Sequence, residues 1–363
     1  HFEVATFRSD GGYSDGRRPD AVFFIDKKED ALRRDFTCNA LFWDPIADRV
    51  YDFVGGEQDI TDRILRFVGD PEARINEDFL RILRAVRFKN ALGFAYGPKL
   101  EEAITRHASL VSQVAAERVK AELEKMLVHP SRLSAIEDLE RLGLLSIILP
   151  EVAALRQIPD AHRDRDVLEH TLECLQQLPA DSSSTLIWAV LLHDTGKAAT
   201  LTRKGDRNHF PRHEVASEEL AQQIGRRLKF SRLETDKIAW LCKHHIPIYQ
   251  VPQMTRAHRL HFFDHPFFED LLILCRADAL ADDGDDSPIR AIEAEYHQAR
   301  EERLLPQFHP PLLDGEAIMQ LTGLEPGTKV GELKDRLREA QINGEVTTEA
   351  EAEQWIRRQA AEA

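Results

Sequence analysis

Apolar residues follow a helical spacing over residues 69–88. They recur at positions i, i+3, i+4 and i+7, as on one face of an amphipathic helix. The residues of this stripe are Phe79, Ile82, Leu83 and Val86. On a helical wheel Glu77, Arg81 and Arg84 lie opposite the stripe, with Asp78 beside them. The pattern predicts one helix with a core-facing stripe and a charged outer face.

The charged face has two interpretations. The simpler one is a solvated surface on which Glu77 and Arg81 form an i,i+4 ion pair. The other is base recognition, because Asp78 can accept a hydrogen bond from an exocyclic amine while Arg81 donates one to the neighbouring ring nitrogen. Cytosine and adenine present that order of groups, whereas guanine and uracil present a carbonyl and an N–H. The pair is therefore a candidate selector of cytosine and adenine.

The remaining patterns divide the chain into a strand-bearing front and a helical remainder. β-type runs at 1–8, 21–25 and 50–56 predict strands, with a Gly/Ser/Asp loop at 9–20. A helix is predicted to begin near Thr37. Residues 98–150 predict helices in which Arg118, Lys120, Lys125 and Arg132 are interpreted as surface charges, with RNA phosphate contacts as the alternative.

The end of the chain also has a helical pattern. From residue 304 onward it predicts two amphipathic helices broken at Gly323 and Pro326, then an acidic helix around Trp355. Near the front, Arg33 and Arg34 precede the helix predicted at Thr37. Two adjacent arginines near a helix start suit an anionic ligand such as a triphosphate.

Histidines and aspartates recur on several predicted helices in the region 166–285. In chain order they are His170, His193, Asp194, His213, His244, His245 and Asp278. A single histidine on an apolar helix is usually a core residue with satisfied hydrogen bonds. Imidazole and carboxylate groups gathered from several helices can instead bind one or two divalent metals, which lower the pKa of bound water towards neutrality.

Composition narrows the class of protein. A chain of 363 residues with 42% hydrophobic content fits two to four folded domains. The net charge is −15, but residues 264–363 carry 23 acidic and 10 basic side chains, so the first 263 are nearly neutral and RNA contact there is not excluded. Four scattered cysteines without a CxxC pair and the lack of an 18-residue apolar run predict a cytoplasmic protein with no membrane span.

The order of motifs EVATFR, DGRRPD, RRDFTCNA, YDFVGG and the segment 69–88 resembles the class II tRNA nucleotidyltransferases, the CCA-adding enzymes, and their bacterial poly(A) polymerase relatives. The resemblance implies an α/β remnant of a nucleotidyltransferase head followed by a mostly α-helical neck, body, HD domain and tail. The implied domains are 1–66 (head), 67–165 (neck and body), 166–290 (HD) and 300–363 (tail).

The resemblance also implies roles for residues of the front half. Asp78 and Arg81 would select CTP and then ATP, with Glu77 orienting Arg81. The residues that would hold ribose and triphosphate, or support the phosphates and the RNA end, are Arg34, Asp35, Asn39, Arg84 and Arg87. Glu3 matches the third carboxylate that binds catalytic Mg²⁺. The DxD pair expected before it is absent, so we expect an N-terminally truncated chain that does not polymerise as it stands.

The histidine-rich region resembles the HD phosphohydrolases. By position, one metal would be held by His170, His193, Asp194 and Asp278. His213 and His245 would complete a second site, with His244 as a substitute, and Lys197 would meet a substrate phosphate. The expected metal is Mg²⁺, Mn²⁺ or Ni²⁺, and the expected activity is phosphatase or 2′,3′-cyclic phosphodiesterase. A degenerate HD fold kept as scaffold is the alternative.

Together these features predict an enzyme that adds CCA, or its A, to the tRNA 3′ end from CTP and ATP, with a homodimer as a candidate assembly. The alternatives are a poly(A) polymerase, and an HD phosphohydrolase whose front half only binds RNA. Phe79, where the poly(A) relatives typically carry proline, favours CCA addition. The DGRRPD loop favours an enzyme able to add the terminal A.

Overall fold

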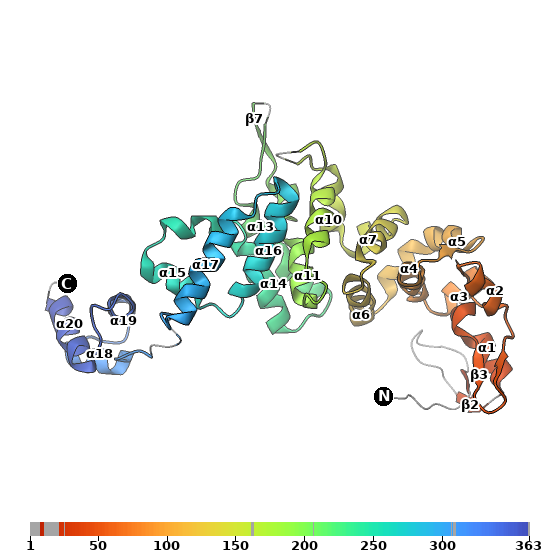
Figure 1. The fold of residues 1–363 in the computed structure, drawn as a ribbon, viewed down its shortest axis with the longest axis horizontal. Helices are drawn as coiled ribbons and strands as arrows, with labels where there is room; N and C mark the ends of the chain where they lie inside the picture. Colours follow the sequence, from red (N-terminus) through yellow and green to blue (C-terminus); the bar gives the residue numbers. More distant parts are fainter. Residues whose placement is uncertain are drawn as a thin grey trace. The chain divides into compact units, whose positions relative to one another are not determined.

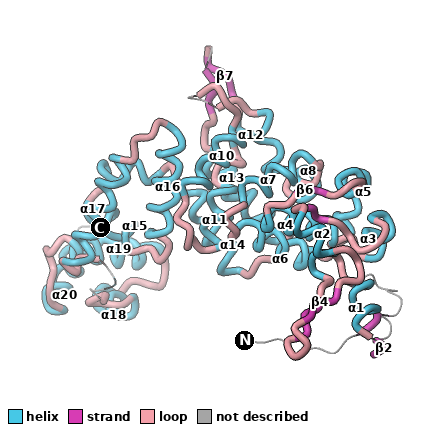
Figure 2. The backbone as a smooth tube through the Cα atoms, turned by 45° about the vertical axis from the view of Figure 1, so that its right-hand side comes forward, coloured by secondary structure: helices cyan, strands magenta, loops and turns pink. Residues whose placement is uncertain are grey.

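The computed structural model describes residues 8–10, 22–24, 26–160, 163–205, 207–305, 307 and 310–361. Helices make up most of it, and its strands are short and paired in twos (Figures 1 and 2). The chain divides into two compact units, His1–Cys242 and Lys243–Ala363. The division falls inside one continuous helix, α14 (Arg232–His244).

The front of the first unit contains most of the described strands. Its elements are β1 (Arg8–Asp10), β2 (Val22–Phe24), α1 (Lys27–Arg33), the 3-10 turn η1 (Thr37–Asn39), β3 (Phe42–Asp44), β4 (Arg49–Tyr51), α2 (Gly56–Thr61) and β5 (Ile64–Leu65). Two antiparallel hairpins join β1 to β2 and β3 to β4, while β5 pairs in parallel with β6 (Ala95–Tyr96).

Two local predictions for the front are wrong in extent. The helix predicted near Thr37 is a single 3-10 turn. The strand predicted over 50–56 ends at Tyr51, because the Asp52 carboxylate accepts hydrogen bonds from the backbone N–H groups of Val54 and Gly55 and so closes a turn. The strand predicted over 1–8 lies almost wholly outside the described residues.

The helix predicted over 69–88 is two helices. α3 (Pro71–Glu77) begins after Asp70, whose carboxylate caps Ala73 N, and α4 (Arg81–Leu92) ends at the left-handed Gly93. Between them Asp78 is extended, with φ −152° and ψ 107°, and its Oδ1 accepts a hydrogen bond from Leu80 N. A short polar side chain that binds the nearby backbone competes with helix continuation, which explains the break.

Three of the four residues of the predicted apolar stripe, Ile82, Leu83 and Val86, are fully buried in the core. The fourth, Phe79, lies in the break between the helices and is half-buried, and the opposite face also differs from the prediction. Arg81, however, is only 7% exposed, because the front of the chain covers the face that was predicted to be solvated. The two helices of residues 71–92 therefore have buried residues on both sides.

Short helices continue the first unit behind α4. They are α5 (Leu100–His107), η2 (Ala108–Gln113), α6 (Ala116–Leu127), α7 (Arg132–Arg141), α8 (Leu145–Ile148), α9 (Pro150–Ala153) and η3 (Ala154–Gln157). Helix α4 packs against α6 and α7. Arg132, interpreted as a surface charge, is instead buried at the start of α7.

The histidine-rich part of the first unit is built around one apolar helix. Its elements are α10 (Val167–Gln177), α11 (Ser184–Leu192), α12 (Lys197–Thr200), the hairpin of β7 (Thr202–Lys204) and β8 (Arg207–His209), α13 (His213–Arg227) and α14. The side chains of α11 from Leu186 to Leu192 are all buried, and the helix packs against α10 and α13. This packing places its C-terminal end in the interior.

The second unit is helical throughout its described residues. Its elements after the end of α14 are η4 (Pro247–Gln253), α15 (Arg256–Phe263), α16 (Phe268–Asp282), α17 (Ser287–Glu301), α18 (Gly315–Thr322), α19 (Thr328–Ile342) and α20 (Glu349–Ala361). The last three share a small core that includes Ile318, Leu337 and Ile356. Among the described residues no helix has both the length and the apolar character needed to cross a bilayer.

Candidate nucleotide-selecting and metal-binding sites

Arg81 is held by three acceptors, one on Nε and two on Nη1. Its Nε donates to Asp35 Oδ1 at 2.7 Å, and its Nη1 donates to Arg74 O at 2.7 Å and to Glu77 Oε2 at 2.6 Å. Burial acts to lower the pKa of Arg81, but Glu77 and Asp35 outweigh it and raise the pKa further. Among the described residues no hydrogen bond involves Arg81 Nη2, so this nitrogen can still donate to a ligand.

Asp78 is positioned from a different helix. Its Oδ2 accepts a hydrogen bond from Arg118 Nη2 on α6 at 2.7 Å, while its Oδ1 is used by Leu80 N. Both side chains of the Asp78–Arg118 pair are about one quarter exposed. A carboxylate oxygen has two lone pairs, so Asp78 can accept from an additional donor without losing Arg118.

Asp35 joins the front of the chain to α4. One of its oxygens accepts from Arg81, and the other lies 2.6 Å from Arg84 Nε in an ion pair whose angle is outside hydrogen-bond geometry. Glu77 is similarly shared, because both Arg74 and Arg81 contact its Oε2. Alternating carboxylates and guanidinium groups thus fix the start of α4 against residues 33–35.

The other predicted nucleotide-binding residues are partly engaged within the protein. Arg34 donates to Asp30 Oδ2 and to the backbone oxygen of Asn39. Arg87 donates to the buried Glu122 on α6 at 2.6 Å, which places it at the contact of two helices. Glu3 lies outside the described residues, so its predicted role is not addressed by the structure.

The end of α11 delivers His193 and Asp194 to the second candidate site. His193 Nδ1 lies 2.7 Å from Val190 O, and His213 Nδ1 lies 3.0 Å from Phe210 O. A carbonyl only accepts, so each Nδ1 carries a proton. With Nδ1 used in this way, Nε2 is the nitrogen of each ring that a metal would bind.

A glycine brings α13 close to this turn. A Cβ on Gly196 would lie 2.2 Å from His213 O and 2.7 Å from Ser217 N, distances that no side chain can occupy. Gly196 N also donates to Ser217 Oγ at 2.9 Å. The close approach places His213 Nε2 3.2 Å from Asp194 Oδ1.

Asp194 lies between two groups of ligand atoms. Its Oδ1 faces His213, while its Oδ2 lies 3.3 Å from His193 Nε2, 3.5 Å from His170 Nε2 and 2.7 Å from Lys197 Nζ. Burial acts to raise the pKa of Asp194, but His193, Lys197 and His213 outweigh it and hold the pKa well below its ordinary value. This carboxyl is therefore ionised at neutral pH and can bridge two cations.

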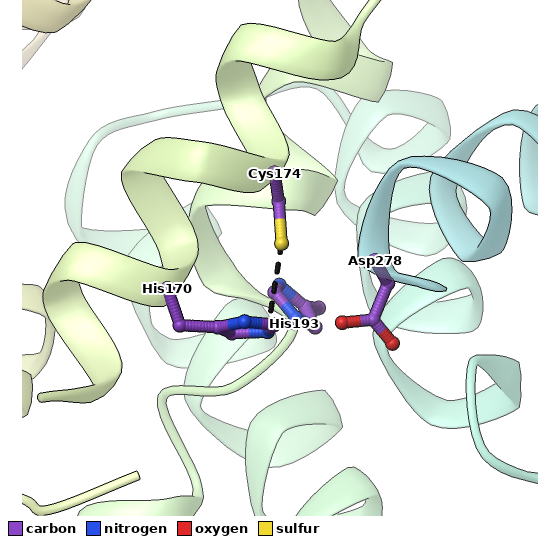
Figure 3. A group of neighbouring side chains, drawn as sticks. All are labelled: His170, Cys174, His193 and Asp278. Atoms are coloured by element: carbon purple, nitrogen blue, oxygen red, sulfur yellow. Dashed lines mark hydrogen bonds between the residues drawn. The ribbon is translucent and has the colours of Figure 1, made fainter. Parts of the chain in front are cut away.

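His170 on α10 has a different surrounding from the other two histidines. Arg165 Nη2 lies 2.8 Å from its Nδ1, and because a guanidinium only donates, the proton of neutral His170 is on Nε2. Cys174, one helical turn later, has its Sγ 3.5 Å from that Nε2. Figure 3 shows the side chains of His170 and Cys174 directed towards His193.

Two predicted ligands belong to the second unit. His245 directly follows α14 and is buried, and its backbone oxygen accepts from Cys275 Sγ. Asp278 is half-buried on α16. The predicted substitute His244 is half-buried and packs its ring against Phe262.

The donor set of the first unit fits a divalent metal. Ligand atoms of His170, Cys174 and His193 lie within 4.8 Å of one another, and those of Asp194 and His213 do so as well. Imidazole nitrogen, carboxylate and thiolate are the common ligands of Zn²⁺ and its neighbours. One adjustment is needed, because a metal on His170 Nε2 requires the ring proton to be on Nδ1. Arg165, which now donates to Nδ1, would then shift towards Asp160 and Glu173, with which Arg165 already forms ion pairs.

Sequence models of three protein families match the chain. The model described as "Poly A polymerase head domain" matches residues 1–66, "Probable RNA and SrmB- binding site of polymerase A" matches residues 93–155, and "HD domain" matches residues 166–283. The combination defines a polymerase-type nucleotidyltransferase that carries an HD domain.

Relatives identify the family more closely. The chain is 37% identical over 352 residues to the A-adding tRNA nucleotidyltransferase of Deinococcus radiodurans, covering 92% of this chain and 80% of that protein. It is 33% identical over 347 residues to the CC-adding enzyme of Thermus thermophilus, covering 91% and 76%. The chain therefore belongs to the family of tRNA nucleotidyltransferases and bacterial poly(A) polymerases, as the resemblance predicted.

Solved structures agree on the fold. The structure of the Bacillus stearothermophilus CCA-adding enzyme in complex with CTP matches with a TM-score of 0.70 and 25% identity, covering 99% of this chain and 79% of that one. The predicted fold class, a small α/β head followed by a mostly helical remainder, is confirmed.

Sequence reasoning missed several residues that the structure places in these sites. Arg74 binds Glu77 and the backbone oxygens of Arg33 and Arg34. Arg118 had been interpreted as a surface charge, yet it binds Asp78. Cys174 had no assigned role. Its spacing from His170 was the one available signal, since residues four apart share a helix face.

Proposed function

We propose that this protein is a tRNA nucleotidyltransferase that adds CCA, or its final A, to the tRNA 3′ end from CTP and ATP. The observation that carries the proposal is the pairing of Asp78 with Arg81 at the α3–α4 break. Arg81 is fixed along Nε and Nη1 and keeps Nη2 for a ligand, while Asp78 is held by Arg118 with lone pairs to spare. The relatives that add A, CC or CCA support the same reaction class.

The physical basis is a match of donors and acceptors. Asp78 accepts from the exocyclic amine of cytosine or adenine, and Arg81 Nη2 donates to the adjacent ring nitrogen. Uracil and guanine present an acceptor to Asp78 and a donor to Arg81. A lost bidentate base contact costs about 1–3 kcal/mol, enough for strong preference when it is combined with repulsion from the wrong base.

Further roles extend this proposal to the rest of the front half. Arg34, Asp35 and Asn39 would position ribose and triphosphate, and Arg84 and Arg87 would support the phosphates and the RNA end. The domain bounds are those given above for head, neck and body, HD domain and tail. Mg²⁺ would serve nucleotidyl transfer. A cytoplasmic location fits the four free cysteines, and a homodimer is a further expectation.

One assay tests the reaction. The full-length protein is incubated with tRNA that lacks its CCA end, and each NTP is offered alone and in pairs. Addition of C and then A, or of a single A to tRNA ending in CC, supports the proposal. A-only tails on any RNA would identify a poly(A) polymerase, and no incorporation of any nucleotide would contradict it. Asp78→Ala should relax or abolish the choice of C and A in the same assay.

We also propose that the HD domain is a metal-dependent phosphohydrolase. The observation that favours it is the convergence of His193, His213 and Lys197 on the two oxygens of Asp194. In this proposal His170, His193, Asp194 and Asp278 hold one metal, and Asp194, His213 and His245 hold a second. The HD family model matches residues 166–283, which include all the residues of this proposal. The metal would lower the pKa of a bound water.

The protein's own groups would act on the substrate. Lys197 lies 2.7 Å from Asp194 Oδ2, and release from that carboxylate would let it bind a phosphate oxygen. Hydrolysis of a 2′,3′-cyclic phosphate or a phosphomonoester, tested separately with Mg²⁺, Mn²⁺ and Ni²⁺, checks the activity. If the chelated protein, reloaded with each of the three metals in turn, hydrolyses neither substrate, an HD fold that serves only as scaffold is favoured.

A further inference from the structure

Cys174 is a buried thiol inside a group of metal-ligand side chains. It lies one turn after His170 on α10 and is fully buried, and its sulfur is 3.5 Å from His170 Nε2. Figure 3 shows the sulfur directed towards the two imidazole rings. His170 and His193 are two of the proposed ligands of the first metal in the HD domain. The thiol of Cys174 therefore lies within that site and does not form a separate one.

The two other buried cysteines have a different surrounding. Cys242 Sγ donates to Ala189 O at 3.7 Å, and Cys275 Sγ donates to His245 O at 3.6 Å. Those contacts are typical of structural thiols. Cys174 instead faces an imidazole nitrogen in a cluster with ligand atoms within 4.8 Å of one another.

The spacing agrees with shared coordination. Zn²⁺ binds thiolate sulfur at about 2.3 Å and imidazole nitrogen at about 2.0–2.1 Å, so two such ligands at a tetrahedral angle lie about 3.5 Å apart. The Cys174–His170 separation is 3.5 Å. A thiol–imidazole hydrogen bond gives the same separation, so the side chains are already spaced for a shared cation in its absence.

We propose that Cys174 is a metal ligand of the HD site and that its thiolate makes the site prefer Zn²⁺ and similar cations to Mg²⁺ and Mn²⁺. On binding, the thiol loses its proton to solvent and a sulfur lone pair bonds to the cation. Thiolate is a soft ligand that suits Zn²⁺, whereas Mg²⁺ and Mn²⁺ prefer oxygen. The inference rests on the metal site proposed above, and it replaces the expected Mg²⁺, Mn²⁺ or Ni²⁺ with a softer class.

Cobalt substitution tests the ligand directly. The full-length protein is stripped with a chelator and reloaded with Co²⁺, whose bond to a thiolate produces a near-ultraviolet sulfur-to-cobalt absorption band. We expect the band in the wild type, its loss in Cys174→Ser, and its retention in Cys242→Ser, which removes the buried thiol that donates to Ala189 O. Absence of the band in Co²⁺-loaded wild type would overturn the inference even where a variant folds poorly.

Metal competition gives a second readout that does not depend on activity. Wild type and Cys174→Ser are equilibrated with equal Zn²⁺ and Mn²⁺, and the bound metals are measured. Loss of one ligand should lower the Zn²⁺ to Mn²⁺ ratio at least about tenfold. Bound Co²⁺ without the band, or an unchanged ratio, would overturn the inference and leave the metal site intact. If wild type binds no more Co²⁺ than Asp194→Asn, the metal site itself is wrong and this inference falls with it.

Discussion

Replacing Asp35 by asparagine should loosen the choice of nucleotide without removing nucleotide addition. Asp35 lies 46 residues before Arg81, and its two oxygens are used by different guanidinium groups, Arg81 Nε at 2.7 Å and Arg84 Nε at 2.6 Å. An asparagine side chain has the same shape but only one acceptor oxygen. Its NH₂ group would therefore face one of the two guanidinium groups, donor against donor.

The magnitude follows from the contacts that survive. A hydrogen bond to a charged group contributes about 1.5–3 kcal/mol to stability. Asp35→Asn weakens the hydrogen bond from Arg81 Nε, while Arg81 Nη1 still donates to Glu77 and to the backbone oxygen of Arg74. The guanidinium group of Arg81 is then held through Nη1 alone and can rotate about that nitrogen. If about half of the lost energy had served to aim Nη2 at the base, about 0.75–1.5 kcal/mol, discrimination falls about three- to tenfold, since about 1.4 kcal/mol is a factor of ten.

The assay is competition between nucleotides in a single addition to tRNA lacking its CCA end. Asp35→Asn should lower the preference for C and A over U and G about three- to tenfold. Asp44→Asn is the matched control, because among the described residues Asp44 accepts hydrogen bonds from Ile46 N and Ala47 N of its own turn. An equal rise in KM for all four nucleotides with unchanged preference would refute the reasoning and would instead support the expected role of Asp35 at the ribose and triphosphate.

Three further predictions concern other contacts. Arg118→Gln should leave the urea midpoint of unfolding nearly unchanged, because the ion pair with Asp78 is partly solvated. The variant should discriminate less well between C and U, and discrimination equal to wild type would argue against a role of Arg118 in positioning Asp78. Asp194→Ala should abolish metal-dependent hydrolysis and spare nucleotide addition, and parallel loss of both would indicate misfolding rather than a lost ligand. Burial acts to raise the pKa of Glu122, but Arg87 and Lys125 outweigh it and lower the pKa. The ionised Glu122 therefore stabilises the fold at pH values above its unfolded pKa, and this stabilisation is lost as the pH falls through the folded pKa. Glu122→Gln should therefore cost about 2–3 kcal/mol at pH 7 and flatten the acid side of the stability profile, and an acid limb identical to wild type would show that another carboxyl dominates.

The sequence was sufficient where the signal is local. Ile82, Leu83 and Val86 of the stripe are buried as their spacing predicted, because helical periodicity depends only on residues within a few turns, whereas Phe79 lies in the break before α4. The tail helices α18 and α19 likewise separate at Gly323, whose φ of 71° suits glycine. The order of histidines and aspartates along the chain identified the HD domain, because each lies in or next to a helix that its own local sequence predicts.

Tertiary structure decided how those groups are aimed. A wheel places Arg81 on an exposed face, but Asp35 and the backbone of Arg74 cover it, and these contacts come from segments that periodicity does not relate. The Asp78 break depends on a local carboxylate contact, yet Arg118 reaches it from another helix. His170 and Cys174 share a face by spacing alone. That this face meets His193 and Asp194 follows from the packing of α10 on α11, because only long-range burial determines which helix faces meet.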